Sequence, residues 1–147
     1  MARRSGLMVL SLVLAFVLAS CGGGATTVAV TLQEFAIIPA EDTAPAGEVT
    51  FEAANEGPED PHELVVASTD LAPDALPTAE DGSVDEEGEG VEVIGEIEEF
   101  APGATETGTF DLEAGSYVLF CNVVEELEGG EVEAHYSLGM RAPFTVE

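Results

Sequence analysis

The chain has 147 residues, 46% of them hydrophobic, and a formal net charge of −27 at pH 7 without a single lysine. This length predicts one domain. The hydrophobic fraction is sufficient for a modest ordered core rather than a disordered acidic chain. Phosphate binding needs clustered Lys or Arg, so the composition excludes nucleic acid as a natural partner.

The N-terminus has the pattern of a secretory signal. Arg3 and Arg4 precede an apolar run over 7–18 that is too short to span a bilayer comfortably. The ending "LASC" resembles the lipobox of bacterial lipoproteins, which implies cleavage before Cys21 and a lipid on Cys21. The alternative is an ordinary signal peptide with an incidental cysteine.

We therefore expect a signal peptide over 1–20, a flexible tether over 21–26 and one domain over 27–147. The domain is expected outside the cytoplasm, anchored to the cell membrane through the lipid on Cys21. Its acidity disfavours binding to an anionic membrane surface by charge. The acidic surface has two possible roles, which are docking to a basic partner and solvation of the protein in salty surroundings.

Short strands follow one another along the rest of the chain. Val28, Val30 and Leu32 alternate with other residues, as in a half-buried strand. Further strands are predicted through Val49 and Phe51, over 62–68, over 90–100, on both sides of a turn at 114–115, and over 140–147. Gly/Pro turns separate them, which is typical of an antiparallel sandwich or barrel. Two acidic stretches, 69–92 and 122–134, are predicted loops, the first with a short helical turn near Leu76.

The mature chain retains very few residues that suit soft metal ions. They are Cys121, His62, His135 and Met140, besides the cysteine of the lipobox. If that cysteine is lipidated, Cys121 has no disulfide partner, which is unusual in a secreted protein. Taken singly, each residue is more often an ordinary core or surface residue. Together they form the ligand set of a type 1 copper site, with one thiolate, two imidazoles and a weak axial thioether.

Three segments, "NEGPEDPHELVV", "GSYVLFC" and "HYSLGMRAPFTV", resemble the cupredoxins, the blue copper family that contains plastocyanin. The resemblance covers roughly 27–147 and implies an all-β, antiparallel Greek-key β-sandwich with acidic loop insertions. It also implies one copper ion with His62, Cys121, His135 and Met140 as ligands. In this family the second histidine typically lies at the exposed edge of the site, which makes His135 the expected point of electron entry or exit.

The chain departs from the family pattern in two places. Thirteen residues separate Cys121 from His135, whereas the family's loop is generally shorter. Glu63 follows His62 where many members have an asparagine whose hydrogen bonds brace the site. The two histidines also limit the protein to one mononuclear site, which argues against a multicopper oxidase or nitrite reductase.

The expected function is that of a one-electron carrier and not of an enzyme. Membrane redox proteins or respiratory complexes are the expected partners, and a monomer is the expected state. One alternative is a copper-binding or delivery protein of the cell envelope. Another is a metal-free cupredoxin-like module that binds a partner protein.

Overall fold

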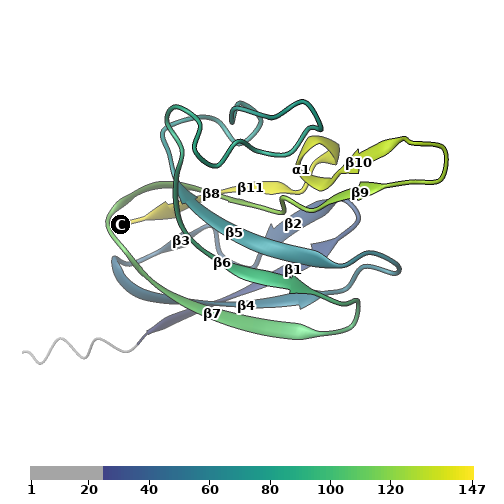
Figure 1. Cartoon of the computed structure of the whole chain (residues 1–147). Coiled ribbons are helices and arrows are strands. Elements are labelled where there is room, and N and C mark those ends of the chain that lie inside the picture. The colour runs from purple at the N-terminus through teal and green to yellow at the C-terminus, as the bar shows by residue number, and fades with distance from the viewer. Residues whose placement is uncertain (1–24) are drawn as a thin grey trace, which may run out of the picture.

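Alternating apolar residues build two β-sheets that pack face to face in the computed structural model, which describes residues 25–147 (Figure 1). The predicted signal peptide, the lipid site at Cys21 and most of the predicted tether lie outside the described residues. Among residues 25–147, no helix has the length and apolar character needed to cross a membrane.

The first sheet has four strands in the order β2-β1-β4-β7. Their bounds are Ala36–Pro39 for β2, Thr26–Gln33 for β1, Gly47–Asn55 for β4 and Thr105–Leu112 for β7. The second sheet has five strands in the order β3-β11-β8-β5-β6. Their bounds are Thr43–Ala44 for β3, Arg141–Val146 for β11, Gly115–Phe120 for β8, His62–Ser68 for β5 and Glu92–Phe100 for β6.

The predicted β-sandwich is confirmed, although its sheets are mixed rather than wholly antiparallel. Strands β1 and β4 pair in parallel, and so do β3 and β11. The other pairs within the two sheets are antiparallel. Strands β2 and β3 were not predicted, because a strand of two to four residues is too short to show a clear alternation.

The core lies between the two sheets and follows the alternation of the sequence. Val28, Val30 and Leu32 of β1 are buried, and so are Val49 and Phe51 of β4. The ring of Phe51 meets that of Phe144 in β11 edge to face, with 5.2 Å between the ring centroids. Such edge-to-face pairs are favourable beyond the area that they bury, so this contact helps to hold the two sheets together.

One end of the sandwich holds a small hairpin and a single helical turn. The hairpin consists of β9 (Val124–Glu126) and β10 (Val132–Ala134), and α1 (His135–Leu138) follows directly. They lie at the end of the molecule away from the C-terminus (Figure 1). The prediction of a loop over 122–134 is wrong in this part, because Gly129 and Gly130 have positive φ angles and turn the chain back on itself.

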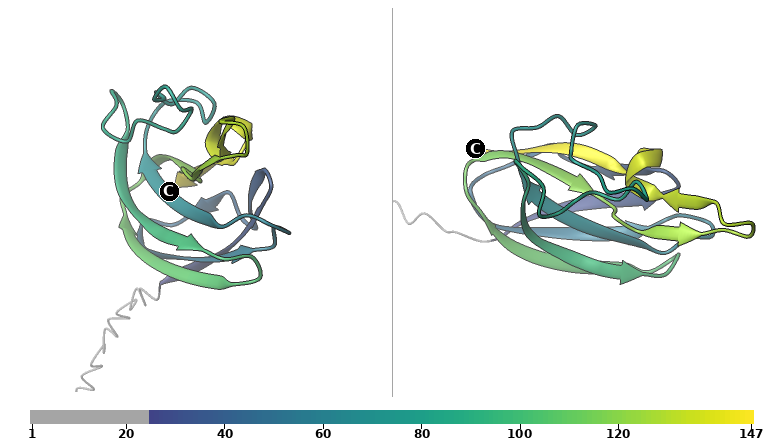
Figure 2. Two further views of the ribbon diagram at one scale, coloured as in Figure 1. Left: turned by 45° about the vertical axis from the view of Figure 1, so that its right-hand side comes forward. Right: turned by 45° about the horizontal axis from the view of Figure 1, so that its top comes forward.

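The acidic excursion after β5 packs over the outer face of the second sheet, towards α1 (Figure 2). Leu76 and Val84 of this excursion are buried against Phe120 and Tyr136 in a second apolar cluster. The expected helical turn near Leu76 is wrong, since the segment forms a tight turn in which the N–H of Ala75 donates to the carbonyl of Ala72. The excursion is therefore an ordered part of the domain that packs against the helix carrying His135.

Candidate metal centre

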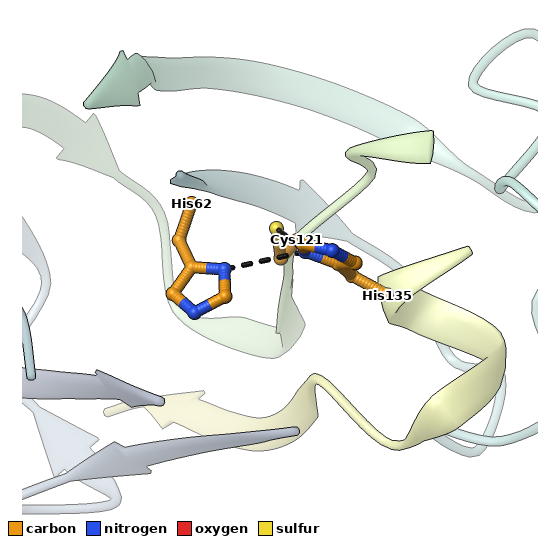
Figure 3. Close-up of side chains that lie close together, drawn as sticks. All are labelled: His62, Cys121 and His135. Carbon is orange, nitrogen blue, oxygen red and sulfur yellow. Dashed lines mark hydrogen bonds between the residues drawn. The ribbon is translucent and has the colours of Figure 1, made fainter. Parts of the chain in front are cut away.

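The structure brings three of the four predicted ligands together. Nδ1 of His62 lies 3.2 Å from Nδ1 of His135, and Sγ of Cys121 lies 3.5 Å from the same nitrogen (Figure 3). One ligand atom from each of the three residues lies within 4.8 Å of the others. Two imidazoles and one thiol from distant parts of the sequence thus face one another at a single point.

Each of these side chains is placed by the end of a regular element. His62 is the first residue of β5, Cys121 directly follows β8, and His135 opens α1 after β10. Main-chain hydrogen bonds join the segments: the N–H of Cys121 donates to the carbonyl of Met140 at 3.1 Å, and the N–H of His135 donates to that of Val123 at 3.0 Å. The first bond places the backbone of Met140 beside Cys121.

All four predicted ligands are fully buried, with relative exposures of 0%. Burial raises the pKa of the Cys121 thiol to about 12. Burial and the neighbouring His135 lower the pKa of His62. At neutral pH the cluster therefore consists of a protonated thiol and a neutral His62 ring, whose unprotonated nitrogen is available to a metal ion. Binding of a metal at the sulfur must release the thiol proton, so metal uptake depends on pH.

The spacing of the donors fits a metal ion. Two nitrogens that each lie about 2.0 Å from one ion at a tetrahedral angle are about 3.3 Å apart. The two Nδ1 atoms of His62 and His135 are 3.2 Å apart. Cys121 has no disulfide partner among the described residues. A buried thiol beside two imidazoles is a donor set that suits copper or zinc.

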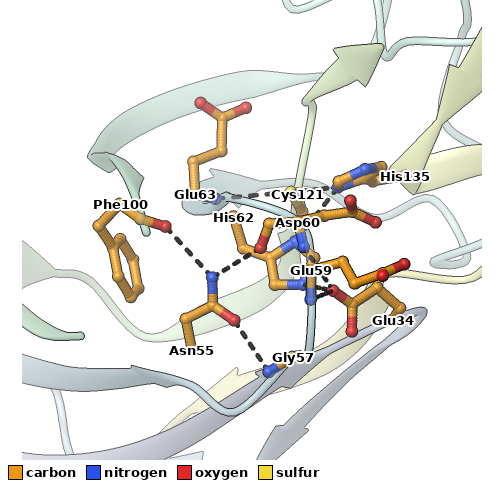
Figure 4. A network of polar contacts seen from close by, with 10 residues as sticks. All are labelled: Glu34, Asn55, Gly57, Glu59, Asp60, His62, Glu63, Phe100, Cys121 and His135. Atoms are coloured by element: carbon orange, nitrogen blue, oxygen red, sulfur yellow. Dashed lines mark hydrogen bonds and ion pairs between the residues drawn. The ribbon is translucent and has the colours of Figure 1, made fainter. Parts of the chain in front are cut away.

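Glu34 lies behind His62 and was missed by the sequence analysis. Its Oε1 lies 3.8 Å from Nε2 of His62 and accepts hydrogen bonds from the N–H groups of Asp60 (2.8 Å) and Glu59 (3.2 Å) (Figure 4). Burial alone would raise the pKa of Glu34, but these backbone donors outweigh it and lower the pKa. A carboxylate therefore stands at the rear of the His62 ring, where metal-binding histidines commonly have one.

Gly57 makes room for this carboxylate. A Cβ at this position would lie 2.6 Å from both oxygens of Glu34. The fully buried Asn55 fixes the same loop, since its Oδ1 accepts from the N–H of Gly57 and its Nδ2 donates to the carbonyls of Asp60 and Phe100. The turn at Asn55 and Gly57 thus helps to position Glu34 beside His62.

Glu63 braces the site from the other side. Its N–H donates to Sγ of Cys121 at 3.5 Å (Figure 4). Its Oε1 accepts from the N–H of Asn122 at 2.9 Å. Burial raises the pKa of Glu63 to about 7, although the bond from Asn122 opposes the shift. The glutamate therefore ties the segment of His62 to that of Cys121, at a position where many cupredoxins have asparagine.

His135 does not lie at an exposed edge, so that expectation is wrong. The ring of Phe35 covers His135 edge to face, with 5.2 Å between the ring centroids. Carboxylates of Asp60, Glu125 and Glu133 also surround the residue, the last two from the β9–β10 hairpin. The residues inserted between Cys121 and His135 thus place Glu125 and Glu133 beside the histidine, while the tip of the hairpin is exposed.

Comparison with solved structures identifies the architecture. The chain is similar to an auracyanin from the photosynthetic bacterium Roseiflexus castenholzii, with 24% identity, a TM-score of 0.57, and coverage of 84% of this chain and 99% of that one. Auracyanin A from Chloroflexus aurantiacus, described as a "blue" copper protein, gives 20% identity, a TM-score of 0.54, and coverage of 84% and 100%.

Auracyanin B gives 20% identity, a TM-score of 0.55, and coverage of 84% of this chain and 89% of that one. No family model and no curated protein matches the sequence. The order of strands, the two packed sheets and these structural likenesses lead to one conclusion. The chain has the cupredoxin fold.

Proposed function

We propose that the protein is a one-electron carrier that binds a single copper ion through His62, Cys121, His135 and Met140. The main observation in favour is the meeting of two imidazoles and a thiol in a fully buried cluster at one end of the sandwich. When bound, copper would supply the redox chemistry by alternating between Cu(I) and Cu(II).

The surrounding residues would keep this site rigid and dry. Burial of the cluster excludes water, and main-chain bonds hold Cys121, His135 and Met140 together. Glu34 favours the tautomer of His62 in which Nε2 carries the proton and Nδ1 keeps its lone pair. A rigid ligand set reduces the rearrangement that accompanies each change of oxidation state, which favours electron transfer over chemistry on a substrate.

We further propose that the carrier works outside the cytoplasm, held at the membrane by a lipid on Cys21. The support is the sequence pattern over 1–21. Membrane redox proteins or respiratory complexes would then be within reach, and the protein would act as a monomer. The auracyanins share the fold, and one of them is described as a "blue" copper protein.

Copper delivery is the second candidate, and the burial of the cluster argues against it. A protein that hands over its ion benefits from an accessible site, whereas His62, Cys121 and His135 are all fully buried. Titration of the purified protein with Cu(II), followed by absorbance, separates the candidates. An electron carrier will develop an intense visible thiolate-to-copper band that saturates at one equivalent and returns after each cycle of reduction and reoxidation.

Other outcomes would contradict the proposal. Colourless binding of Cu(I) alone would indicate delivery. Metal content and stability that stay unchanged in Cys121→Ser would indicate a metal-free module.

A band that appears in the wild type and is lost in Cys121→Ser would support the carrier.

A further inference from the structure

The β9–β10 hairpin places two acidic side chains near His135. Glu125 and Glu133 are directly opposite each other in the antiparallel ladder of this hairpin. Asp60 approaches from the loop before β5. One carboxylate oxygen of each residue and one ring nitrogen of His135 all lie within 4.8 Å of one another.

This arrangement is unfavourable unless a cation is present. Like charges directly opposite each other in a β-ladder destabilise it, and a third carboxylate adds to the repulsion. Arg141 is the only Lys or Arg within residues 25–147. Its guanidinium donates to the carbonyl of Tyr136 and lies over the ring of that residue, 5.1 Å from the centroid. The described part of the chain therefore offers no free basic side chain to this cluster.

His135 provides a second, independent sign of a ligand. Its Nδ1 faces His62 and Cys121, as described above. Its Nε2 is buried and has no hydrogen-bond partner among the described residues. Buried polar atoms are normally paired, so an unpaired nitrogen in a residue of 0% exposure requires an explanation. The three carboxylates are the acidic groups that lie together with a ring nitrogen of this histidine, and Figure 4 shows the side chain of Asp60 beside the ring.

We propose that Asp60, Glu125, Glu133 and Nε2 of His135 form a second cation site, separate from the thiol site and sharing the imidazole of His135 with it. One imidazole nitrogen with several carboxylate oxygens suits a divalent transition ion such as Zn²⁺ or Mn²⁺ better than Ca²⁺, which prefers oxygen ligands alone. If both ring nitrogens hold ions, the imidazole proton is released to solvent. This inference goes beyond the proposed electron transfer and does not require it.

The site also explains the long segment between Cys121 and His135. A bound cation would cancel the repulsion between Glu125 and Glu133 and would join the hairpin to the loop of Asp60. Because His135 would also bind this cation, the hairpin and the loop of Asp60 would together hold the imidazole of His135 in place. A chain without that insertion could not place two carboxylates there.

Calorimetric titration of the purified protein with Zn²⁺ tests the proposal. The copper-loaded form is used first, so that Zn²⁺ does not enter the thiol site. We expect one saturable equivalent of Zn²⁺ in the wild type. In the double variant Glu125→Gln/Glu133→Gln the affinity should fall by about tenfold or more. Asp60→Asn, in a different segment, should also weaken binding, and its main-chain bonds to Asn55 and Glu34 do not depend on the altered group.

Glu126→Gln/Glu131→Gln is the matched control, because it removes two charges from exposed positions of the same hairpin. Its Zn²⁺ affinity should change by about twofold at most. The proposal is overturned if Zn²⁺ does not bind saturably, or if the control loses as much affinity as the cluster variant. The same titration on copper-free protein should give two equivalents, one of which should bind about tenfold or more weakly in Glu125→Gln/Glu133→Gln. The titration of the copper-free protein would therefore still test the second cation site if the protein did not bind copper.

Discussion

Nε2 of His62 lies 3.8 Å from Oε1 of Glu34, and neither this nitrogen nor the second oxygen of Glu34 has a hydrogen-bond partner among residues 25–147. The carboxylate is held in place by two backbone N–H groups rather than by the histidine. It is 12% exposed, so its charge is only partly screened by water. His62 therefore faces the thiol cluster with Nδ1 and a fixed negative charge with Nε2.

Replacing Glu34 by glutamine removes that charge while keeping an oxygen for the two backbone donors. We expect copper affinity to fall by roughly 10–100-fold, the usual loss when the carboxylate behind a metal-binding histidine is removed. The reduction potential should rise, because a nearby negative charge favours Cu(II) over Cu(I). Voltammetry and competition with a copper chelator measure the two effects.

Glu56→Gln is the control for this prediction, since Glu56 is an exposed residue of the same loop. It should change neither quantity appreciably. An equal shift in both variants would mean that only the overall charge matters.

Adding a methyl group at Gly57 should displace the carboxylate of Glu34. The new Cβ would meet both carboxylate oxygens at 2.6 Å. Gly57→Ala should therefore lower the free energy of unfolding by about 2 kcal/mol, because hydrogen bonds to a charged group are lost. Urea unfolding of the metal-free protein measures it. In a Glu34→Ala background the same substitution should cost less than about 0.5 kcal/mol, so a double-mutant cycle should show coupling. Additive costs would contradict the contact.

Glu63 should make the metal-free protein less stable as the pH rises. Its pKa is raised by burial to about 7, above the ordinary value of 4.5. Between these values the folded state keeps a proton that the unfolded state loses, so this group's contribution to stability is present below about pH 4.5 and is lost as the pH rises through about 7. Glu63→Gln should remove this contribution and be more stable at pH 8 by an amount on the order of 2–3 kcal/mol.

Unfolding curves of the wild type, Glu63→Gln and the exposed control Glu98→Gln between pH 4 and 8 would test this sign. His62 contributes in the opposite direction, because its lowered pKa means that stability is lost as the pH falls. The difference between the variants isolates Glu63. If it does not grow with pH, the carboxyl of Glu63 is not buried as described.

Tyr136 should hold the acidic excursion against α1. Its hydroxyl donates to the carbonyl of Pro73 at 2.8 Å and accepts from the N–H of Leu76 at 3.1 Å. Tyr136→Phe leaves both groups without this partner and should cost about 1–3 kcal/mol in chemical unfolding. Tyr117→Phe is the matched control, because the hydroxyl of Tyr117 makes a single bond, to the carbonyl of Glu113. A larger loss in the control would contradict the assigned role.

The strands that could be predicted from sequence are those with one buried face. Val28, Val30 and Leu32 alternate because they point into the core, and the same holds for Val49 and Phe51. The cluster of His62, Cys121 and His135 could be predicted from composition, because the mature chain has so few soft donors. The assignment of these residues and Met140 as copper ligands stays a prediction.

Other features had weaker signals or none. The pair Gly129-Gly130 is a recognisable hairpin signal, but the flanking strands are short and exposed and show no apolar face. Glu34 is distant in sequence from His62 and looks like any other acidic residue in a turn. The burial of His135 depends on how the hairpin and Phe35 fold over it, which is a tertiary effect that local patterns do not contain.

X-ray absorption spectroscopy at the copper edge, applied to the copper-loaded protein, tests the central claim most directly. If the cluster of His62, Cys121 and His135 holds the ion, the spectrum of the wild type will show one sulfur and two imidazole nitrogens as close ligands. The sulfur will be absent in Cys121→Ser. A copper environment made only of oxygen and nitrogen, identical in both proteins, would contradict the account.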